Sequence, residues 1–558
     1  MANNTDQKLS KEKLLAEIER LKKELKKKKQ YGLVWEPKTE EVVEMCKEKL
    51  PVLKEVKNKE IITDKNKPVN LLIEGDNYHA LSVLNYTHAK KVDVIYIDPP
   101  YNTGNKDFIF NDHYVDREDA YRHSKWLAFM EKRLKLAKNL LKDIGVIFVS
   151  IDDNEMAELK LLMDDRNRGL FGEDNFLGTI VRRRRESQAN LSKNLSTIHE
   201  YVLCYAKSSR AQLNKLLPEL DKSDFINLDN DSRGPYVTMP CTNKGGTKYT
   251  IITPTGKKYT DEWRFKKETY SNLLKDNRIV FPNRGNGKPR YKLFYSEKME
   301  KGVIPNTWWD DAASNQEATI ELKAIFGGDL IFNNPKPTGL IKKLIKLSTL
   351  KDGIILDFMA GSGTTGHAVL EVNKEDGGDR KFILCTNNEN NNGNGYKIAE
   401  DICYPRIKKV IEGYKNLKGQ KVEGLGGNLK YFKTDFVDYD EPTDRNKIKL
   451  TEQATEMLCV KEGTFEKVLP ARRSLGAGGD QKSFKVFKNA NHYTSIIFDQ
   501  AEIPTFKKAI KNIKEKFSIY VFSLGDETFD DEFKDVKQKV QLSPIPEAIL
   551  RVYRRIFK

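Results

Sequence analysis

One stretch of the sequence reads Gly353-Ile354-Ile355-Leu356-Asp357-Phe358-Met359-Ala360-Gly361-Ser362-Gly363-Thr364-Thr365-Gly366. It begins with an apolar run that ends in Asp357, which predicts a buried strand carrying a carboxylate at its carboxyl end. The three glycines that follow match a nucleotide-binding fingerprint, because glycine lets the backbone approach a ligand closely and a following helix offers free N–H groups. No Gly-Lys-Ser/Thr follows, so a Walker A loop is excluded. The stretch therefore predicts a nucleotide or nucleoside pocket in an α/β sheet.

Strands and helices alternate on both sides of this stretch. Further apolar runs predict strands over 69–73, 92–97, 145–151 and 381–385. Helical patterns over 78–84 and 121–142 lie between them. The alternation indicates an α/β fold with a doubly wound, mainly parallel sheet.

Composition narrows the class of protein. A net charge of +16 over 558 residues favours a polyanionic partner. No apolar run is long enough for a transmembrane helix, and the charged N-terminus lacks a secretory signal. The six cysteines form no Cys-x-x-Cys pair and the histidines are dispersed, so we expect no metal site. We expect a soluble, cytoplasmic protein.

The chain divides by pattern into five segments. The Lys-rich start predicts a basic helix that is either simply solvated or used for docking. Residues from about 180 to 330 lack the regular alternation, which predicts an inserted domain. The expected segments are a basic helix, a first α/β part, an inserted domain, a second α/β part and a C-terminal α/β domain, over residues 1–35, 36–178, 179–330, 331–440 and 441–558.

The tetrad Asp98-Pro99-Pro100-Tyr101 ends the predicted strand over 92–97, at the edge where α/β sheets bind ligands. The exocyclic amine of adenine is a poor nucleophile, because its lone pair is delocalised into the ring. Two acceptors on its N–H groups draw the nitrogen toward a nucleophilic geometry, and Asp98 and the Pro99 carbonyl are suited to that role. Pro100 fixes the backbone, and Tyr101 is suited to stack on an extruded base.

The carboxylate of Asp357 decides between cofactors. It would repel a pyrophosphate, yet it suits the ammonium group of S-adenosylmethionine (SAM). A NAD-dependent dehydrogenase built on the glycine loop remains an alternative, although it leaves the tetrad unexplained.

The order of these motifs resembles a known family. With the tetrad before the glycine loop and an irregular region between them, the chain is similar to the β group of amino-DNA methyltransferases, which are circularly permuted. It resembles more closely the modification subunit of type III restriction–modification systems. Segments that carry the resemblance are 32–36, 74–77, 333–337, 385–389 and 545–558.

The resemblance implies a site-specific methyltransferase that transfers a methyl group from SAM to N6 of a flipped adenine in duplex DNA. It implies catalytic roles for Asp98, Pro99, Pro100 and Tyr101 and no need of a metal. It also implies a bacterial or archaeal protein that forms a homodimer and can add a restriction subunit for ATP hydrolysis and cleavage. In the segments above it implies a catalytic part, an inserted target-recognition domain, a SAM-binding part and a C-terminal domain for dimerisation or partner docking. The expected cofactor-binding residues are Asp76, Lys336, Pro337, Asp357, Ala360, Gly361, Ser362, Gly363, Thr364, Thr365 and Glu389.

Several details stay open at the level of sequence. Lys336 is expected to meet the carboxylate of SAM and Asp76 its adenine amine, while Glu389 either holds the ribose or is a plain loop residue. The block Arg182, Arg183, Arg184 and Arg185 is expected to grip DNA phosphates, unless it is a solvated face. N4-cytosine methylation is an alternative, and so is a subunit that recognises DNA without catalysis.

Overall fold

The structure is a computed structural model. It describes residues 35–105, 107–186, 194–218, 220–311, 313–389, 395–439, 443–469, 484–525, 527–536 and 539–557. The expected basic helix over 1–35 lies outside these residues except for Trp35. The described chain forms two compact units, one of residues 213–306 and one of the residues on either side. No described helix has the length and apolarity that crossing a bilayer requires.

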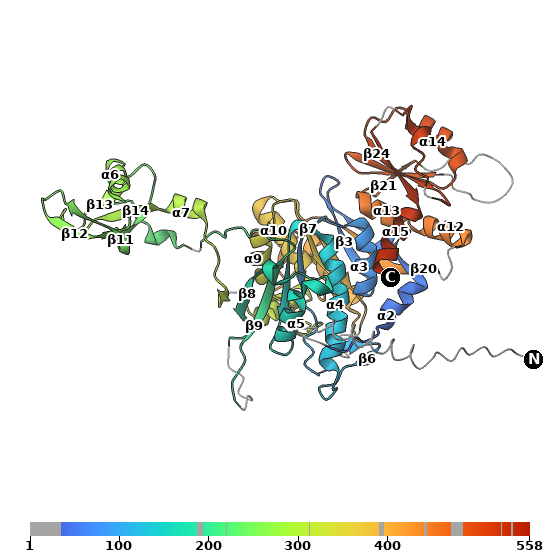
Figure 1. The fold of residues 1–558 in the computed structure, drawn as a ribbon, viewed down its shortest axis with the longest axis horizontal. Coiled ribbons are helices and arrows are strands. Elements are labelled where there is room, and N and C mark those ends of the chain that lie inside the picture. Colours follow the sequence, from blue (N-terminus) through green and yellow to red (C-terminus); the bar gives the residue numbers. More distant parts are fainter. Residues whose placement is uncertain are drawn as a thin grey trace, which may run out of the picture. The chain divides into compact units, whose positions relative to one another are not determined.

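The larger unit is built on one eleven-stranded sheet (Figure 1). Its strands in spatial order are β1 (Lys49–Glu55), β20 (Asn428–Asp438), β3 (Val69–Glu74), β17 (Lys381–Thr386), β16 (Ile354–Asp357), β4 (Val92–Ile97), β7 (Leu141–Ile151), β9 (His199–Ala206), β8 (Phe176–Arg183) and β15 (Trp308–Trp309), with β2 (Ile61–Ile62) beside β20. The six strands from β20 to β7 are parallel, whereas β9 runs antiparallel to both of its neighbours. The expected mainly parallel sheet is therefore confirmed.

Helices cover both faces of this sheet, as the burial of its central strands requires. On one face, α3 and α4 share a core with the odd-numbered side chains of β3 and β4, such as Ile73 and Ile95. In α4 a buried stripe recurs at helical spacing through Trp126, Met130 and Leu134. The helices of this unit before its C-terminal segment are α2 (Glu41–Glu44), α3 (Asn77–Thr87), α4 (Arg122–Leu140), α5 (Met156–Asp164), α8 (Asn315–Ile325), α9 (Thr338–Ser348), α10 (Thr364–Asp376) and α11 (Tyr404–Glu412).

The C-terminal segment forms a second, five-stranded mixed sheet. Its last helix joins it to the main sheet, because the Tyr553 hydroxyl donates to the Pro51 carbonyl of β1 at 2.5 Å. The elements of this segment are α12 (Asp444–Gln453), α13 (Thr455–Glu462), β21 (Glu466–Leu469), β22 (Phe484–Lys488), β23 (His492–Ile497), α14 (Ile503–Ile510), β24 (Lys516–Phe522), β25 (Val540–Ile545) and α15 (Glu547–Ile556). Two small hairpins, β5–β6 and β18–β19, complete the larger unit, over Ile109–Phe110, His113–Tyr114, Gly413–Lys415 and Lys421–Glu423.

The smaller unit, residues 213–306, is narrower than the inserted domain expected over 179–330. The difference arises because β8, β9 and β15 pair with the main sheet instead of with the insertion. Its own elements are β10 (Tyr236–Pro240), β11 (Thr242–Ile252), β12 (Lys258–Trp263), α6 (Lys267–Lys275), β13 (Ile279–Val280), β14 (Arg290–Phe294) and α7 (Tyr295–Lys301). The two ends of the unit are paired, since Leu216 and Val303 exchange two backbone hydrogen bonds.

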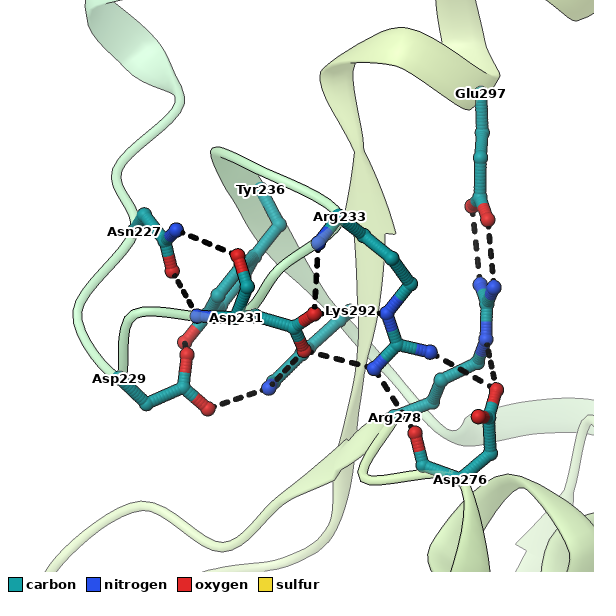
Figure 2. Close-up of polar contacts among 9 residues, drawn as sticks. All are labelled: Asn227, Asp229, Asp231, Arg233, Tyr236, Asp276, Arg278, Lys292 and Glu297. Carbon is teal, nitrogen blue, oxygen red and sulfur yellow. Dashed lines mark hydrogen bonds and ion pairs between the residues drawn. The ribbon is translucent and has the colours of Figure 1, made fainter.

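A network of charged side chains holds this smaller unit together (Figure 2). The buried ammonium of Lys292 on β14 contacts Asp229 at 2.5 Å and Asp231 at 2.9 Å. Arg233 donates hydrogen bonds from two nitrogens to the two carboxylate oxygens of Asp231, and from the third to Asp276 at 2.9 Å. The hydrogen bonds from Arg233 and Lys292 hold the pKa of Asp231 far below its usual range. The network thus pins the loop before β10 onto β14.

We predict that Lys292→Met loosens the smaller unit, because it leaves Asp231 without the cation that reaches it from β14. Backbone amides of β10 and β14 should exchange with deuterium at least about tenfold faster, as measured by mass spectrometry. Lys288→Met is the matched control, since Lys288 pairs with Asp261 at an exposed position. Equal exchange in the two variants would contradict the role of Lys292.

Candidate active site

The site forms where neighbouring parallel strands end. In β16, Leu356 lies opposite Ile95 of β4, so Asp357 and Asp98 reach the same carboxyl edge of the sheet. The two carboxylates are close enough that the charge of Asp98 adds to burial in raising the pKa of Asp357. This edge is the usual ligand-binding side of an open α/β sheet.

The tetrad after β4 is held by side chains from three directions. Asp98 Oδ1 accepts a hydrogen bond from the Tyr101 hydroxyl at 2.9 Å and pairs with the Lys336 ammonium at 3.0 Å. The Trp126 indole N–H donates to the Pro100 carbonyl at 2.7 Å. The carbonyl of Pro99 accepts no hydrogen bond from the described part of the chain. One carboxylate oxygen and one carbonyl oxygen are thus left for a ligand with two N–H groups.

Lys336 lies beside the tetrad. Its buried ammonium contacts Asp98, the Tyr101 hydroxyl at 2.7 Å and both oxygens of Glu200, at 3.3 and 3.4 Å. In this structure Lys336 therefore contacts the tetrad, and its contact with the carboxylate of SAM stays a prediction. Glu200, at the start of β9, was not singled out from the sequence.

Glu200 is the fully buried anion between two cations. It accepts from Arg182 Nε at 2.7 Å, and neither side chain has any exposed surface. Burial raises the pKa of Glu200, but Lys336 and Arg182 outweigh burial, so the pKa lies below its ordinary value. Burial also raises the pKa of Asp98, and there Lys336 offsets only part of the effect. The pKa values of the two carboxylates are thus shifted in opposite directions.

The arginine block is divided by the strand that contains it. Because successive side chains of a strand point to opposite faces, Arg182 turns inward against Glu200 while Arg183 faces solvent. Arg182 also donates to the Ala313 carbonyl at 2.9 Å and to Asn315. The expected phosphate contact of Arg182 is therefore contradicted by its burial. For Arg183, Arg184 and Arg185 it stays a prediction; Arg185 is exposed and Arg184 is partly buried.

The glycine loop follows β16 directly and leads into α10. Gly361 and Gly363 adopt left-handed backbone angles, with φ of 47° and 80°. A side chain at position 363 would also lie 3.0 Å from the Cys403 sulfur, so both conformation and space require glycine there. The hydroxyls of Ser362 and Thr364, expected at the cofactor, instead accept from buried Arg406 at 3.0 and 2.7 Å. Their backbone atoms are left to face a ligand.

Asp357 is suited to a cationic ligand. Its oxygens accept from the Met359 backbone N–H at 3.0 Å and the Thr365 hydroxyl at 2.5 Å. No cationic side chain of the described residues pairs with it. Burial raises the pKa of Asp357 to about 7. A bound ammonium group would supply the missing positive charge, whereas a pyrophosphate would meet repulsion.

The remaining predicted residues follow neighbouring strands on the same edge. Asp76 comes after β3, where it caps α3 by accepting from Tyr78 N at 2.7 Å and pairs with Arg133 at 3.5 Å. Glu389 comes after β17 and accepts from the Asn387 amide at 2.5 Å. Pro337 is the N-cap residue of α9. Ala360 donates its N–H to the Cys385 carbonyl at 3.1 Å, which anchors the loop to β17.

Comparison with known proteins places these features in a family. The sequence profile described as DNA methylase, of N6 and N4 methyltransferases, matches residues 92–392. The chain is 39% identical over 394 residues to the type III restriction-modification enzyme StyLTI Mod subunit of Salmonella typhimurium, covering 64% of this chain and 59% of that protein. It is 33% identical to the type II methyltransferase M.KpnI of Klebsiella pneumoniae, over 62% of this chain and 89% of that one.

A third relative is the type III restriction-modification enzyme EcoPI Mod subunit of Escherichia phage P1. It is 32% identical over 412 residues, which cover 62% of each chain. The match to both Mod subunits thus spans about three fifths of their length. The match to M.KpnI covers most of that protein.

We predict that Glu200→Ala destabilises the larger unit by about 3 kcal/mol, because it leaves the Arg182 guanidinium buried without its anion. The unfolding midpoint in urea, followed by circular dichroism, measures the effect. The control is Arg183→Ala, since Arg183 follows Arg182 on β8 and is exposed. This variant should change stability by less than about 0.5 kcal/mol. A Glu200→Ala variant as stable as Arg183→Ala would contradict this account of the charges.

Proposed function

The chain belongs to the DNA methylase family, and we propose that it methylates N6 of adenine at a specific site in duplex DNA with SAM as methyl donor. The observation that carries the proposal is the shared strand edge of Asp98 and Asp357. It sets two acceptors for an exocyclic amine beside a buried carboxylate that lacks a cation. The first position of the tetrad is Asp, the form that the resemblance associates with adenine, whereas Ser is more frequent in N4-cytosine enzymes.

The residues of the tetrad divide the work on the base. Asp98 Oδ2 and the Pro99 carbonyl would accept the two N–H groups of the adenine amine. Lys336 and the Tyr101 hydroxyl hold Asp98 Oδ1, which orients the other oxygen toward the amine. Because its pKa is raised, the Asp98 carboxylate is suited to accept the proton that the amine loses. The ring of Tyr101 would stack on the flipped base.

The glycine loop would hold the cofactor. Asp357 would pair with the methionine ammonium of SAM, and the backbone from Ala360 to Thr365 would line its methionine part. Asp76 and Glu389, at the ends of β3 and β17, would reach the adenine amine and ribose hydroxyls. When bound, SAM supplies a methyl group on a sulfonium that is already activated for in-line displacement. The role of the protein is then to orient the amine and keep its lone pair available.

We assign DNA recognition to the smaller unit, residues 213–306. Four of its acidic residues are paired within the network of Figure 2, and exposed lysines follow its hairpin and helix. These are Lys244, Lys248, Lys257, Lys258, Lys266 and Lys267. Such a surface suits the phosphate backbone of DNA.

The similarity to the StyLTI and EcoPI Mod subunits supports a further step in the proposal. The protein would act as the modification and specificity subunit of a type III system, as a homodimer able to bind a restriction subunit. The C-terminal sheet, residues 441–558, is the segment that we assign to dimerisation or to docking that partner.

We predict that Asp98→Ala and Asp98→Asn each lower methylation about 10³-fold, because the amine loses its charged acceptor. The assay is transfer of labelled methyl from SAM to unmethylated genomic DNA, with modified bases located by single-molecule sequencing. SAM affinity should stay within about threefold of the unaltered protein, since Asp98 lies outside the glycine loop. Asp153→Asn, an exposed carboxylate at the same sheet edge, is the control. Undiminished methylation in both Asp98 variants would refute the mechanism.

We predict that SAM binds more tightly as pH rises through about 7, because Asp357 must be ionised to pair with an ammonium group. Below that pH the raised pKa leaves the carboxyl neutral, and the dissociation constant should rise about tenfold per pH unit. Isothermal calorimetry between pH 5.5 and 8.5 tests this. Asp357→Asn should bind weakly at every pH. A pH-independent affinity in the unaltered protein would contradict the assignment of Asp357.

A further inference from the structure

Behind the tetrad lies a buried polar group that the reaction does not itself use. Asn102 follows Tyr101 directly, is 1% exposed and has a left-handed backbone with φ of 55°. Its side-chain amide donates to Glu155 Oε1 at 2.5 Å. The ring of His123 lies 2.7 Å from the same oxygen through Nδ1. A non-glycine residue keeps such a backbone conformation only where its surroundings fix it.

The three side chains come from three different elements. Asn102 belongs to the turn after β4, His123 to the first turn of α4, and Glu155 to the start of α5 after β7. Glu155 is the N-cap residue of α5, yet its side chain does not cap that helix. Although it is fully buried, it extends instead to the tetrad turn. The group therefore ties together the carboxyl ends of the adjacent strands β4 and β7.

Other contacts act on the same turn from α4. Arg122 donates through Nε to His123 Nε2 at 3.1 Å, so the proton of the neutral ring lies on Nδ1 and is donated to Glu155. Arg122 also reaches the Asn102 carbonyl at 3.4 Å, and Trp126 holds the Pro100 carbonyl. The residues on either side of Tyr101 are thus fixed by hydrogen bonds, while the Tyr101 hydroxyl points to Asp98.

We propose that Glu155 is a positioning residue, which acts through Asn102 and together with His123 to hold the turn that presents Tyr101 to the target base. The inference rests on the proposed function for its effect on methylation, but not for its structural content. Without the hydrogen bonds to Glu155, nothing in this group would keep Asn102 in its left-handed conformation. The ring of Tyr101 and the Pro99 carbonyl, both covalently close to Asn102, would then lose their fixed positions.

The charge state of Glu155 gives the inference a signature. Burial raises the pKa of Glu155 to about 8, and the negative charges of Glu158 and Asp152 add to it. The Asn102 hydrogen bond and the charge of Arg122 act in the opposite direction. Burial and Arg122 lower the pKa of His123, so that ring supplies no positive charge near neutral pH. A pKa of about 8 favours the protonated form of Glu155 at pH 7, and its Oε1 accepts both hydrogen bonds.

Ionisation above pH 8 places an uncompensated charge in this buried position. A carboxylate there gains by turning toward water, which releases Asn102. The stability of the fold should also decrease as pH rises. Because the folded pKa lies above its ordinary value, the fold is progressively disfavoured as pH rises from about 4.5 to about 8.

The experiment compares Glu155→Gln, Glu155→Ala and the control Glu158→Gln with the unaltered full-length protein. Glutamine copies the neutral acid and cannot ionise. Glu158 is a neighbouring carboxylate on α5 that makes no hydrogen bond to the tetrad turn. The first readout is the methylation rate at saturating SAM and DNA from pH 6.5 to 9.5. The second is deuterium exchange of the segment 98–105 at pH 7, which requires no activity.

We expect the methylation rate of the unaltered protein to fall above pH 8, as Glu155 ionises. Glu155→Gln should keep the rate at pH 7 within about twofold of the unaltered protein and should show no such fall. Glu155→Ala should lower the maximal rate by about tenfold to a hundredfold, with SAM affinity unchanged, and should speed exchange of segment 98–105. Glu158→Gln should keep the fall in rate but shift it to lower pH, because loss of this negative charge lowers the pKa of Glu155, and its segment 98–105 should exchange more slowly than that of Glu155→Ala. Rescue by glutamine but not alanine is not expected of a residue that merely fills space.

The inference is overturned if alanine and glutamine have equal effects, or if the fall in rate above pH 8 persists in Glu155→Gln. If the unaltered protein methylates no DNA, the proposed function fails, and the exchange comparison alone decides the role of Glu155. Equal exchange of segment 98–105 in Glu155→Ala and Glu155→Gln would then overturn it, whereas faster exchange in Glu155→Ala alone would support it.

Discussion

The parallel pairing of β4 with β16 is the constraint on which the site depends. The two strands lie far apart in the chain, yet they share a register that sets Asp98 and Asp357 at one edge of the sheet. Each carboxylate follows directly on an apolar run, and it therefore lies at the carboxyl end of the strand that this run forms. The carboxyl ends of parallel strands lie at one edge of a sheet, so residues far apart in the sequence come close together there. Here β3 and β17 bring Asp76 and Glu389 to that edge as well.

Buried charge is distributed unevenly around this edge. Glu200 has two cations and stays ionised, Asp98 shares one of them, and Asp357 has none. The pKa is therefore lowered for Glu200 and raised for Asp98 and Asp357, of which Glu200 and Asp357 are buried and Asp98 is partly exposed. Burying a charge is costly unless a partner offsets it, so the carboxylate without a cation marks the place where a positively charged ligand would be most favourable.

Local patterns in the sequence were enough to predict the sheet and the tetrad. The apolar run of β4 agrees with its predicted bounds over 92–97, because a central parallel strand is apolar on both faces. The contact of Glu200 with Lys336 and Arg182 could not be predicted, since it depends on β9 pairing with β8 on one side and with β7 on the other. A run of arginines gives no sign that strand alternation turns one of them inward. The hydroxyls of Ser362 and Thr364 likewise meet Arg406 through a packing contact with α11.

The paired ends of the smaller unit have an evolutionary consequence. Leu216 and Val303 exchange backbone hydrogen bonds, so the chain leaves and rejoins the unit at nearly the same point. A segment closed in this way can be replaced by recombination without lengthening or straining the strands that flank it. Its hydrophobic core and its charge network lie entirely within residues 213–306, so both would be replaced together with the segment. Such a replacement leaves the strand edge with Asp98 and Asp357 unchanged.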